Sequence, residues 1–293
     1  MEHPRKRTAK ERRLRARRLR EISPYMAMTP FIMPSRNDAL VNFTDTLDIT
    51  DTEQFILQQR KNGMKGLGML QIFIAGYIRA VSQCPQLNRF VCGQQIYARD
   101  AVEVVMTVKR KMTLDGEESS IKITLPPSAT LQEVCEKLKT AIDEIKNGEE
   151  NDTDKLASWF MKLPRGFLRS VMWLLRVFDY HGWLPPALLE ASPFHGSLIV
   201  TDVGSLGIPP VFHHIYNFGN LPVFISFGTK YRKNIINDDG QVEKHCYIDY
   251  CVVIDERICD GSAYAKGVRV MRQSFKKPAS LLEPPETVKE DII

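Results

Sequence analysis

The stretch Ile254-Asp255-Glu256-Arg257-Ile258-Cys259-Asp260-Gly261 brings four charged residues together at one point of the chain. The residues before it, from His245 to Ile254, are apolar and β-rich, which predicts a buried strand. The residues after it, from Gly261 to about Phe275, predict a helix. Charges at the end of a buried strand are costly unless they form ion pairs or serve a site. The segment therefore predicts either a structural Asp–Arg network or a functional site.

The rest of the chain predicts strands and helices that interleave. Apolar or alternating β-rich segments predict strands at 40–49, 101–112, 119–125, 197–203 and 222–228. Apolar residues at helical spacing predict helices at 51–62, 67–83 and 130–145, the last of which begins with a capping box, Thr130 to Glu133. The dipeptide Asp115-Gly116 predicts a hairpin, and the Met- and Pro-rich segment 26–34 predicts extended chain. This order is typical of an α/β fold with a mixed sheet.

Several motifs resemble those of one family. Asp255 to Gly261 is similar to the D-H-R-x-x-D-G motif of the catalytic domain of the dihydrolipoamide acyltransferases of the 2-oxoacid dehydrogenase complexes. Weaker similarities to that family's D-V-T, P-x-x-N and G-T-F-T-I-S-N-L-G segments occur in the family's order at Asp48 to Thr50, Pro85 to Asn88 and Ser197 to Gly207. The resemblance covers about residues 25–275. It implies an α/β fold of the chloramphenicol acetyltransferase type, a mixed β-sheet with packed helices.

The resemblance also implies a catalytic site. The family's catalytic histidine, which takes a proton from a thiol, corresponds to Glu256, and its oxyanion-stabilising Ser or Thr corresponds to Thr201. Asp260 completes the candidate catalytic set, and the structural residues expected beside it are Asp255, Arg257 and Gly261. A carboxylate is a competent general base where burial raises its pKa toward neutrality. The alternative is that Glu256 forms a salt bridge and no longer serves thiol acyl transfer.

Two adjacent histidines, His213 and His214, are candidate substrate-binding residues. They lie in an uncharged segment where the family has a loop near its substrate channel, and one of them could replace the missing base. Adjacent residues of an extended segment face opposite ways, so at most one would point inward. The alternative is a structural, hydrogen-bonded pair beside Tyr216 and Asn217. The same two interpretations apply to His195.

The function implied by the resemblance is acyl transfer between coenzyme A, or another thiol, and an unknown acceptor. Coenzyme A or acyl-coenzyme A would be a substrate, and no metal is expected. The family assembles as trimers with active sites between subunits, so we expect a homotrimer. The sequence contains no lipoyl attachment domain and no subunit-binding domain, which indicates a free-standing, divergent member. The contrasting hypothesis is a catalytically silent trimeric scaffold, or a protein that only binds an acyl group or coenzyme A.

The first residues differ from the body of the chain in charge. Residues 1–20 contain ten basic and two acidic residues, whereas the remainder is slightly acidic. We therefore expect a basic, disordered arm at 1–24, an acyltransferase-like domain at 25–277 and a flexible tail at 278–293. The basic residues at 5–20 suggest a solvated tail, a nucleic-acid contact or a contact with an anionic membrane surface. Lipid chemistry at a membrane surface, aided by the Trp-rich region 159–183, is a further hypothesis.

The composition excludes several classes of protein. Hydrophobic residues make up 43% and charged residues 26%, as in ordinary globular proteins rather than disordered chains. The six cysteines form no C-x-x-C pair and have no histidine at metal-site spacing, which predicts reduced thiols. Prolines and charges interrupt the apolar stretches, and no secretory signal follows the basic start. We therefore expect no transmembrane segment and a cytoplasmic location.

Overall fold

The computed structural model describes residues 6–109, 118–146 and 152–292. Its helices are α1 (Ala9–Leu14), α2 (Pro24–Ile32), α3 (Thr50–Lys61), α4 (Met69–Gln83), α5 (Leu131–Lys146), α6 (Asp152–Met161), α7 (Arg165–His181), α8 (Pro186–Ala191) and α9 (Gly261–Lys276). Its strands are β1 (Ala16–Arg18), β2 (Leu40–Asp48), β3 (Arg89–Cys92), β4 (Gln95–Arg99), β5 (Val102–Lys109), β6 (Glu118–Leu125), β7 (Leu198–Asp202), β8 (Val223–Ile236) and β9 (Val242–Asp255).

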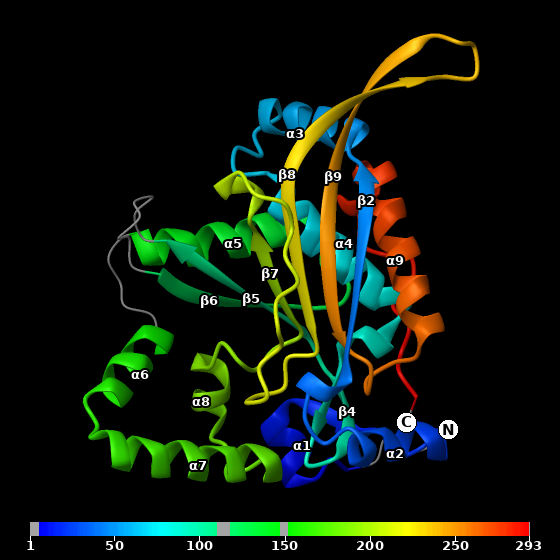
Figure 1. Cartoon of the computed structure of the whole chain (residues 1–293). Coiled ribbons are helices and arrows are strands. Elements are labelled where there is room, and N and C mark those ends of the chain that lie inside the picture. The colour runs from blue at the N-terminus through cyan, green and yellow to red at the C-terminus, as the bar shows by residue number, and fades with distance from the viewer. Residues whose placement is uncertain (1–5, 110–117, 147–151, 293) are drawn as a thin grey trace.

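The larger sheet has the strand order β2-β9-β8-β7-β5-β6. Strand β7 runs parallel to β5 and to β8, and the other neighbouring pairs are antiparallel. The sheet is therefore mixed, and the predicted fold class is confirmed. Strands β8 and β9 continue beyond the sheet as a long hairpin (Figure 1). A smaller sheet, β1-β4-β3, lies at the opposite end of the molecule.

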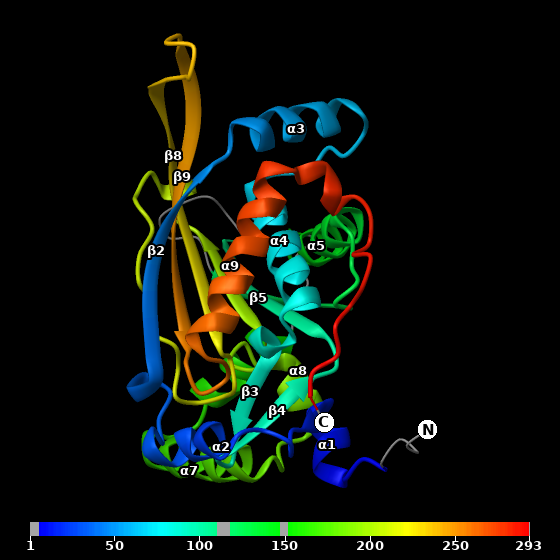
Figure 2. The same ribbon diagram turned by 90° about the vertical axis from the view of Figure 1, so that its right-hand side faces the viewer.

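The main core lies between the large sheet and helices α4, α5 and α9, which cover one face of it (Figure 2). Helix α4 is apolar nearly all round because it touches both other helices as well as the sheet. Phe73 of α4 stacks on Phe227 of β8, with 4.3 Å between ring centroids, and meets the edge of Phe275 of α9 at 4.8 Å. Offset and edge-on aromatic pairs of this kind add to the stability of a core beyond the area they bury.

The other face of the sheet is covered by a long connection, residues 203–222, between β7 and β8. Ile215 and Leu221 of this segment pack on Phe224 and Val253 in a second, smaller apolar cluster. Because side chains alternate along a strand, Leu198 and Val200 of β7 point into the main core, whereas Thr201 lies on the face that carries this connection.

The expectation of a disordered arm is wrong for residues 6–24. Helix α1 has a capping box between Thr8 and Glu11, and β1 pairs with β4. Leu14 and Ala16 are buried with aromatic residues of the small sheet. Leu14 ends α1 and Arg15 has a left-handed backbone with a φ of 48°, and this turn brings Leu14 and Ala16 into the same apolar cluster.

The segment 26–34 is also not extended, because most of it belongs to α2. Ser23 is the N-cap, its hydroxyl accepting a hydrogen bond from the Met26 amide, and Pro24 occupies the first turn. Proline is favoured at this position because the amide hydrogens of the first turn have no partner in the helix. Pro30 is tolerated near the end of α2, where the Thr29 hydroxyl donates to the Met26 carbonyl that the amide of residue 30 would otherwise have used.

The C-terminal segment follows a defined path instead of forming a flexible tail. The Lys289 amide donates to the Ser82 carbonyl at 2.8 Å. The Asp291 carboxylate pairs with the Arg89 guanidinium, and these side chains are only 4% and 5% exposed. The segment up to Ile292 is therefore attached to α4 and to the small sheet.

Two local predictions concern the β5–β6 hairpin and α5. Strands β5 and β6 pair antiparallel as predicted, and the turn at Asp115-Gly116 lies outside the described residues. The capping box of α5 is confirmed, because the Glu133 side chain accepts from the Thr130 amide and the Thr130 hydroxyl accepts from the Glu133 amide.

Candidate functional site

A cavity of about 500 Å³ lies where β9 ends and α9 begins. Glu256 and Asp260 line it on one side, together with Tyr264 of α9. Helix α2 forms an apolar wall opposite, through residues such as Tyr25 and Met26. Carboxylates in a largely apolar cavity are typical of a binding or catalytic site.

A buried ion-pair network holds the β9–α9 loop, residues 256–260, which carries Glu256. The Asp255 carboxylate accepts two hydrogen bonds from the Arg257 guanidinium, at 2.8 and 2.7 Å, and one from the Arg257 amide at 3.2 Å. It also lies 3.4 Å from the Arg36 guanidinium. Arg257 also donates to the Met33 carbonyl at the end of α2, and Arg36 donates to the Gly219 carbonyl. Burial lowers the pKa of Arg36, and the charge of Asp255 acts against this shift. The network thus joins the end of β9 to α2 and to the connection 203–222.

Asp260 acts on the backbone of α9. It is the N-cap, and its carboxylate accepts from the Ala263 amide and from the Ser262 hydroxyl, both at 2.9 Å. These hydrogen bonds lower the pKa of Asp260. Gly261 begins the helix, and an added Cβ there would meet the Tyr264 ring at an ordinary distance of 3.6 Å. The geometry of Asp260 is that of a helix cap at the rim of the cavity.

Glu256 is placed differently from its charged neighbours. Its amide donates to the Ala39 carbonyl, which holds the backbone beside β2. Its side chain is exposed toward the cavity and forms no ion pair with any residue that the structure describes. The carboxylate is therefore open to a ligand, and it does not form the salt bridge that was the alternative expectation.

Thr201 does not reach this cavity within the same chain. It lies on β7, where it pairs with Ser226 of β8, which in turn pairs with Cys251 of β9. Glu256 follows Cys251 by five residues, which is roughly 16 Å along a strand, and β7 lies two strands away. One copy of the chain therefore brings together Glu256 and Asp260 but not Thr201.

His213 and His214 also lie away from the Glu256 cavity. His213 stacks on Phe224 with 4.7 Å between the rings, and its Nδ1 donates to the His214 carbonyl at 2.7 Å. The His214 ring meets the edge of Tyr216. Neither histidine lines this cavity, so within one chain neither of them replaces the missing base.

His195 is buried in a network that joins α7 to the segment before β7. Its Nε2 donates to the Asp179 carboxylate at 3.1 Å, and its Nδ1 accepts from the Ser192 hydroxyl at 2.8 Å. Asp179 also accepts from the Gly219 amide. Burial lowers the pKa of His195, although Asp179 acts in the opposite direction. The residue types resemble a hydrolase triad, but the ring nitrogens are exchanged and Ser192 is buried, so the network is structural.

Two parts of the Glu256 cavity were missed in the sequence. Helix α2 has a start signal, Ser23-Pro24, which the Met- and Pro-rich residues after it obscured. Arg89, another lining residue, holds the C-terminal Asp291, a partner more than 200 positions away. No local pattern predicts a contact at that separation.

Solved structures show which proteins share this fold. The chain is similar to a probable dihydrolipoamide acetyltransferase from Listeria monocytogenes, with a TM-score of 0.57, 15% identity and coverage of 88% of this chain and 94% of that one. It is similar to dihydrolipoamide acetyltransferase from Azotobacter vinelandii, with a TM-score of 0.57, 14% identity and coverage of 83% and 84%. A truncated catalytic core of the 2-oxoacid dehydrogenase multienzyme complex from Thermoplasma acidophilum gives 0.53, 13%, and coverage of 89% and 98%.

The chain therefore has the fold of the acyltransferase catalytic domains of 2-oxoacid dehydrogenase complexes, and the predicted resemblance is confirmed at the level of fold. No protein-family model and no curated protein sequence matches the chain.

Within the described residues, no helix has the length and apolar character needed to cross a membrane. The same residues contain no group of three side chains arranged to hold a metal ion.

Proposed function

We propose that the protein transfers an acyl group between coenzyme A, or another thiol, and an acceptor, with Glu256 as the general base. The observation that carries this proposal is the placement of Glu256. On the fold of an acyltransferase catalytic domain, its carboxylate is open to a cavity of about 500 Å³ and has no ion-pair partner among the described residues. The buried Asp255–Arg257 pair beside it supports the backbone without engaging that carboxylate.

In the proposed reaction, Glu256 takes the proton from the attacking thiol. The resulting thiolate attacks the carbonyl carbon of the acyl thioester, and the hydroxyl of Thr201 donates a hydrogen bond to the oxyanion of the tetrahedral intermediate. Collapse of the intermediate breaks the carbon–sulfur bond to the first thiol, which recovers the proton from Glu256. These reaction steps require neither a redox change nor a metal ion.

The distance between Thr201 and Glu256 in one chain favours a site shared by two chains. We infer a symmetric trimer in which Thr201 of a neighbour faces the cavity that holds Glu256, as the resemblance implies. A neighbour that covers the cavity would also remove water from Glu256. Loss of water favours the neutral form of a carboxyl group, so the carboxylate becomes a stronger base.

The test is release of free coenzyme A from a panel of acyl-coenzyme A donors with dihydrolipoamide as acceptor. We expect turnover by the native protein and a loss of at least about 100-fold in Glu256→Gln, the usual contribution of a general base. The matched control is Glu283→Gln, which changes an exposed glutamate away from this cavity. Equal turnover in native protein and Glu256→Gln would refute the role of Glu256.

The alternative, a silent scaffold or binding protein, gives a different result in the same assay. The native protein would show no turnover, but it would still bind an acyl-coenzyme A in equilibrium dialysis. Activity that appears only in Glu256→His would show an intact cavity whose base has been lost. Either result would replace catalysis by binding as the function of this cavity.

A further inference from the structure

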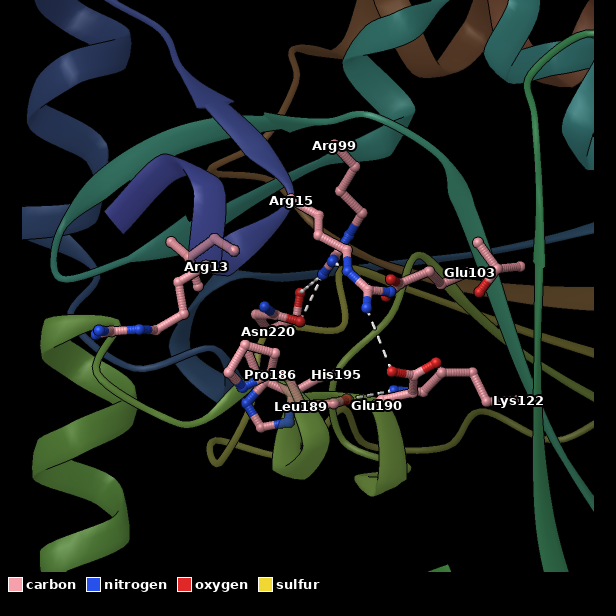
Figure 3. A pocket seen from close by; sticks show the side chains of 12 residues that line it. Arg13, Arg15, Arg99, Glu103, Lys122, Pro186, Leu189, Glu190, His195 and Asn220 are labelled. Carbon is pink, nitrogen blue, oxygen red and sulfur yellow. Dashed lines mark hydrogen bonds and ion pairs between the residues drawn. The ribbon is translucent and has the colours of Figure 1, made fainter. Parts of the chain in front are cut away.

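A second, smaller cavity shares no lining residue with the Glu256 cavity. It has a volume of about 30 Å³, room for about two water molecules. Figure 3 shows the side chains that line it. They come from the end of α1 and the turn after it, the end of β4, strands β5 and β6, helix α8, and the two segments that precede β7 and β8. Residues distant in the sequence thus meet around one small space.

Basic groups outnumber acidic groups around this cavity. The cations are Arg13, Arg15, Arg99 and Lys122, and the carboxylates are Glu103 and Glu190. Arg15 pairs with Glu190 at 3.3 Å, and both side chains are more than half exposed. This pair lies at the mouth of the cavity and leaves Glu103 as the carboxylate for the buried cations. The charge balance among the described lining residues favours an anion.

Arg99 is the more deeply buried of the inner cations, with 5% of its side chain exposed. Its guanidinium lies 4.2 Å from the centre of the Phe90 ring and 3.4 Å from the Glu103 carboxylate, and it donates to Asn220. Its Nε–H is buried and finds no hydrogen-bond partner within the described part of the chain. A buried charged donor with incomplete hydrogen bonding costs free energy unless a ligand or water supplies what is missing.

Lys122 is the second inner cation, and within residues 6–109, 118–146 and 152–292 its direct partner is a carbonyl and not a carboxylate. Its Nζ donates to the Leu189 carbonyl of α8 at 2.7 Å. Burial lowers the pKa of Lys122 to about 8, although Glu103 acts in the opposite direction. His195 contributes no positive charge here, because burial also lowers its pKa. An ammonium group in this position is stabilised if an anion enters the cavity.

We propose that this cavity binds a phosphate group, held by Arg99 and Lys122 at its floor and admitted past the Arg15–Glu190 pair. A guanidinium from β4 and an ammonium group from β6 suit the oxygens of phosphate and its double negative charge. The exposed mouth leaves space for either inorganic phosphate or the phosphate of a monoester. The site is independent of the proposed acyl transfer.

Titration calorimetry of the full chain with inorganic phosphate, and separately with glycerol phosphate, tests the site at constant ionic strength set by chloride. We expect saturable binding of at least one of them and at least a 10-fold weaker affinity in Lys122→Gln. The matched control, Lys244→Gln, removes an exposed lysine from the β8–β9 hairpin and should bind as the native protein does. A preference for inorganic phosphate or for the monoester would identify the source of the phosphate group.

A second measurement separates binding from folding effects. The rate at which acetic anhydride acetylates Lys122, followed by peptide mass spectrometry, should fall at least 5-fold when phosphate is present, because a bound anion keeps the amine protonated. Acetylation of Lys244 should not change. Absence of binding by both phosphate compounds, or equal affinity in Lys122→Gln and native protein, would overturn the proposal.

Discussion

His195 shows how one buried side chain makes stability depend on pH. Burial lowers its pKa below the ordinary value near 6.5, so the folded protein keeps the ring neutral where the unfolded chain takes up a proton. Stability should therefore fall as the pH decreases below about 6.5, by at most about 1.4 kcal/mol per pH unit. Urea denaturation at several pH values between 5 and 8 gives the free energy of unfolding, which should depend less on pH in His195→Gln than in the native protein. The pH dependence should persist in His181→Gln, which changes an exposed position on α7. An unchanged pH dependence in His195→Gln would show that His195 is not its source.

Arg89 and Asp291 allow a comparison of a buried ion pair with an exposed one. Their side chains are 5% and 4% exposed, whereas those of Arg7 and Asp100 are 42% and 38% exposed. Asp291→Asn leaves a buried cation without its counter-charge and should lower the free energy of unfolding by about 3–5 kcal/mol. Asp100→Asn should lower it by less than about 1 kcal/mol. Equal losses in urea denaturation would show that the C-terminal segment does not hold Arg89.

At the scale of elements, the connection 203–222 depends on a close approach between two backbone segments. Gly219 has a φ of 89°, and a Cβ there would lie 2.0 Å from the Phe194 carbonyl oxygen. Gly207 has a similar φ of 76° but open space around it. Gly207→Ala should cost about 1–2 kcal/mol from backbone strain alone, and Gly219→Ala should cost clearly more because the backbone must also shift. Thermal unfolding of both variants measures the difference, and equal losses would exclude the steric contribution.

At the scale of the whole molecule, the separation of Thr201 from Glu256 predicts a site assembled from two chains. Sedimentation analysis should give the mass of a trimer, and Thr201→Val and Glu256→Gln should each be inactive alone. When equal amounts of the two variants are unfolded and refolded together, random assembly places an intact Thr201 opposite an intact Glu256 at about a quarter of the sites. We therefore expect about a quarter of native activity. Full inactivity of the mixture, with the trimer intact, would mean that both residues are required from the same chain.

The sequence by itself determined the class of fold, because its strongest signals are local. Apolar residues at strand or helix spacing predicted the strands and helices of the main domain, and the capping box of α5 follows from residues three positions apart. The motif from Asp255 to Gly261 located the cavity, since the end of β9 and the start of α9 are adjacent in the chain. It also marked Glu256, whose side chain lies at that junction.

Only the tertiary structure decided which charges are buried and which residues meet. Alternation along β6 sends Ile121 and Ile123 into the core and Lys122 to the opposite face, where the Leu189 carbonyl of α8 accepts its hydrogen bond. In the same way β4 provides the partner that orders β1 within the basic arm. These contacts join segments that are far apart in the sequence, so the hydrophobic periodicity of a single segment does not predict them. Burial and charge pairing, unlike strand or helix periodicity, are properties of the packed molecule.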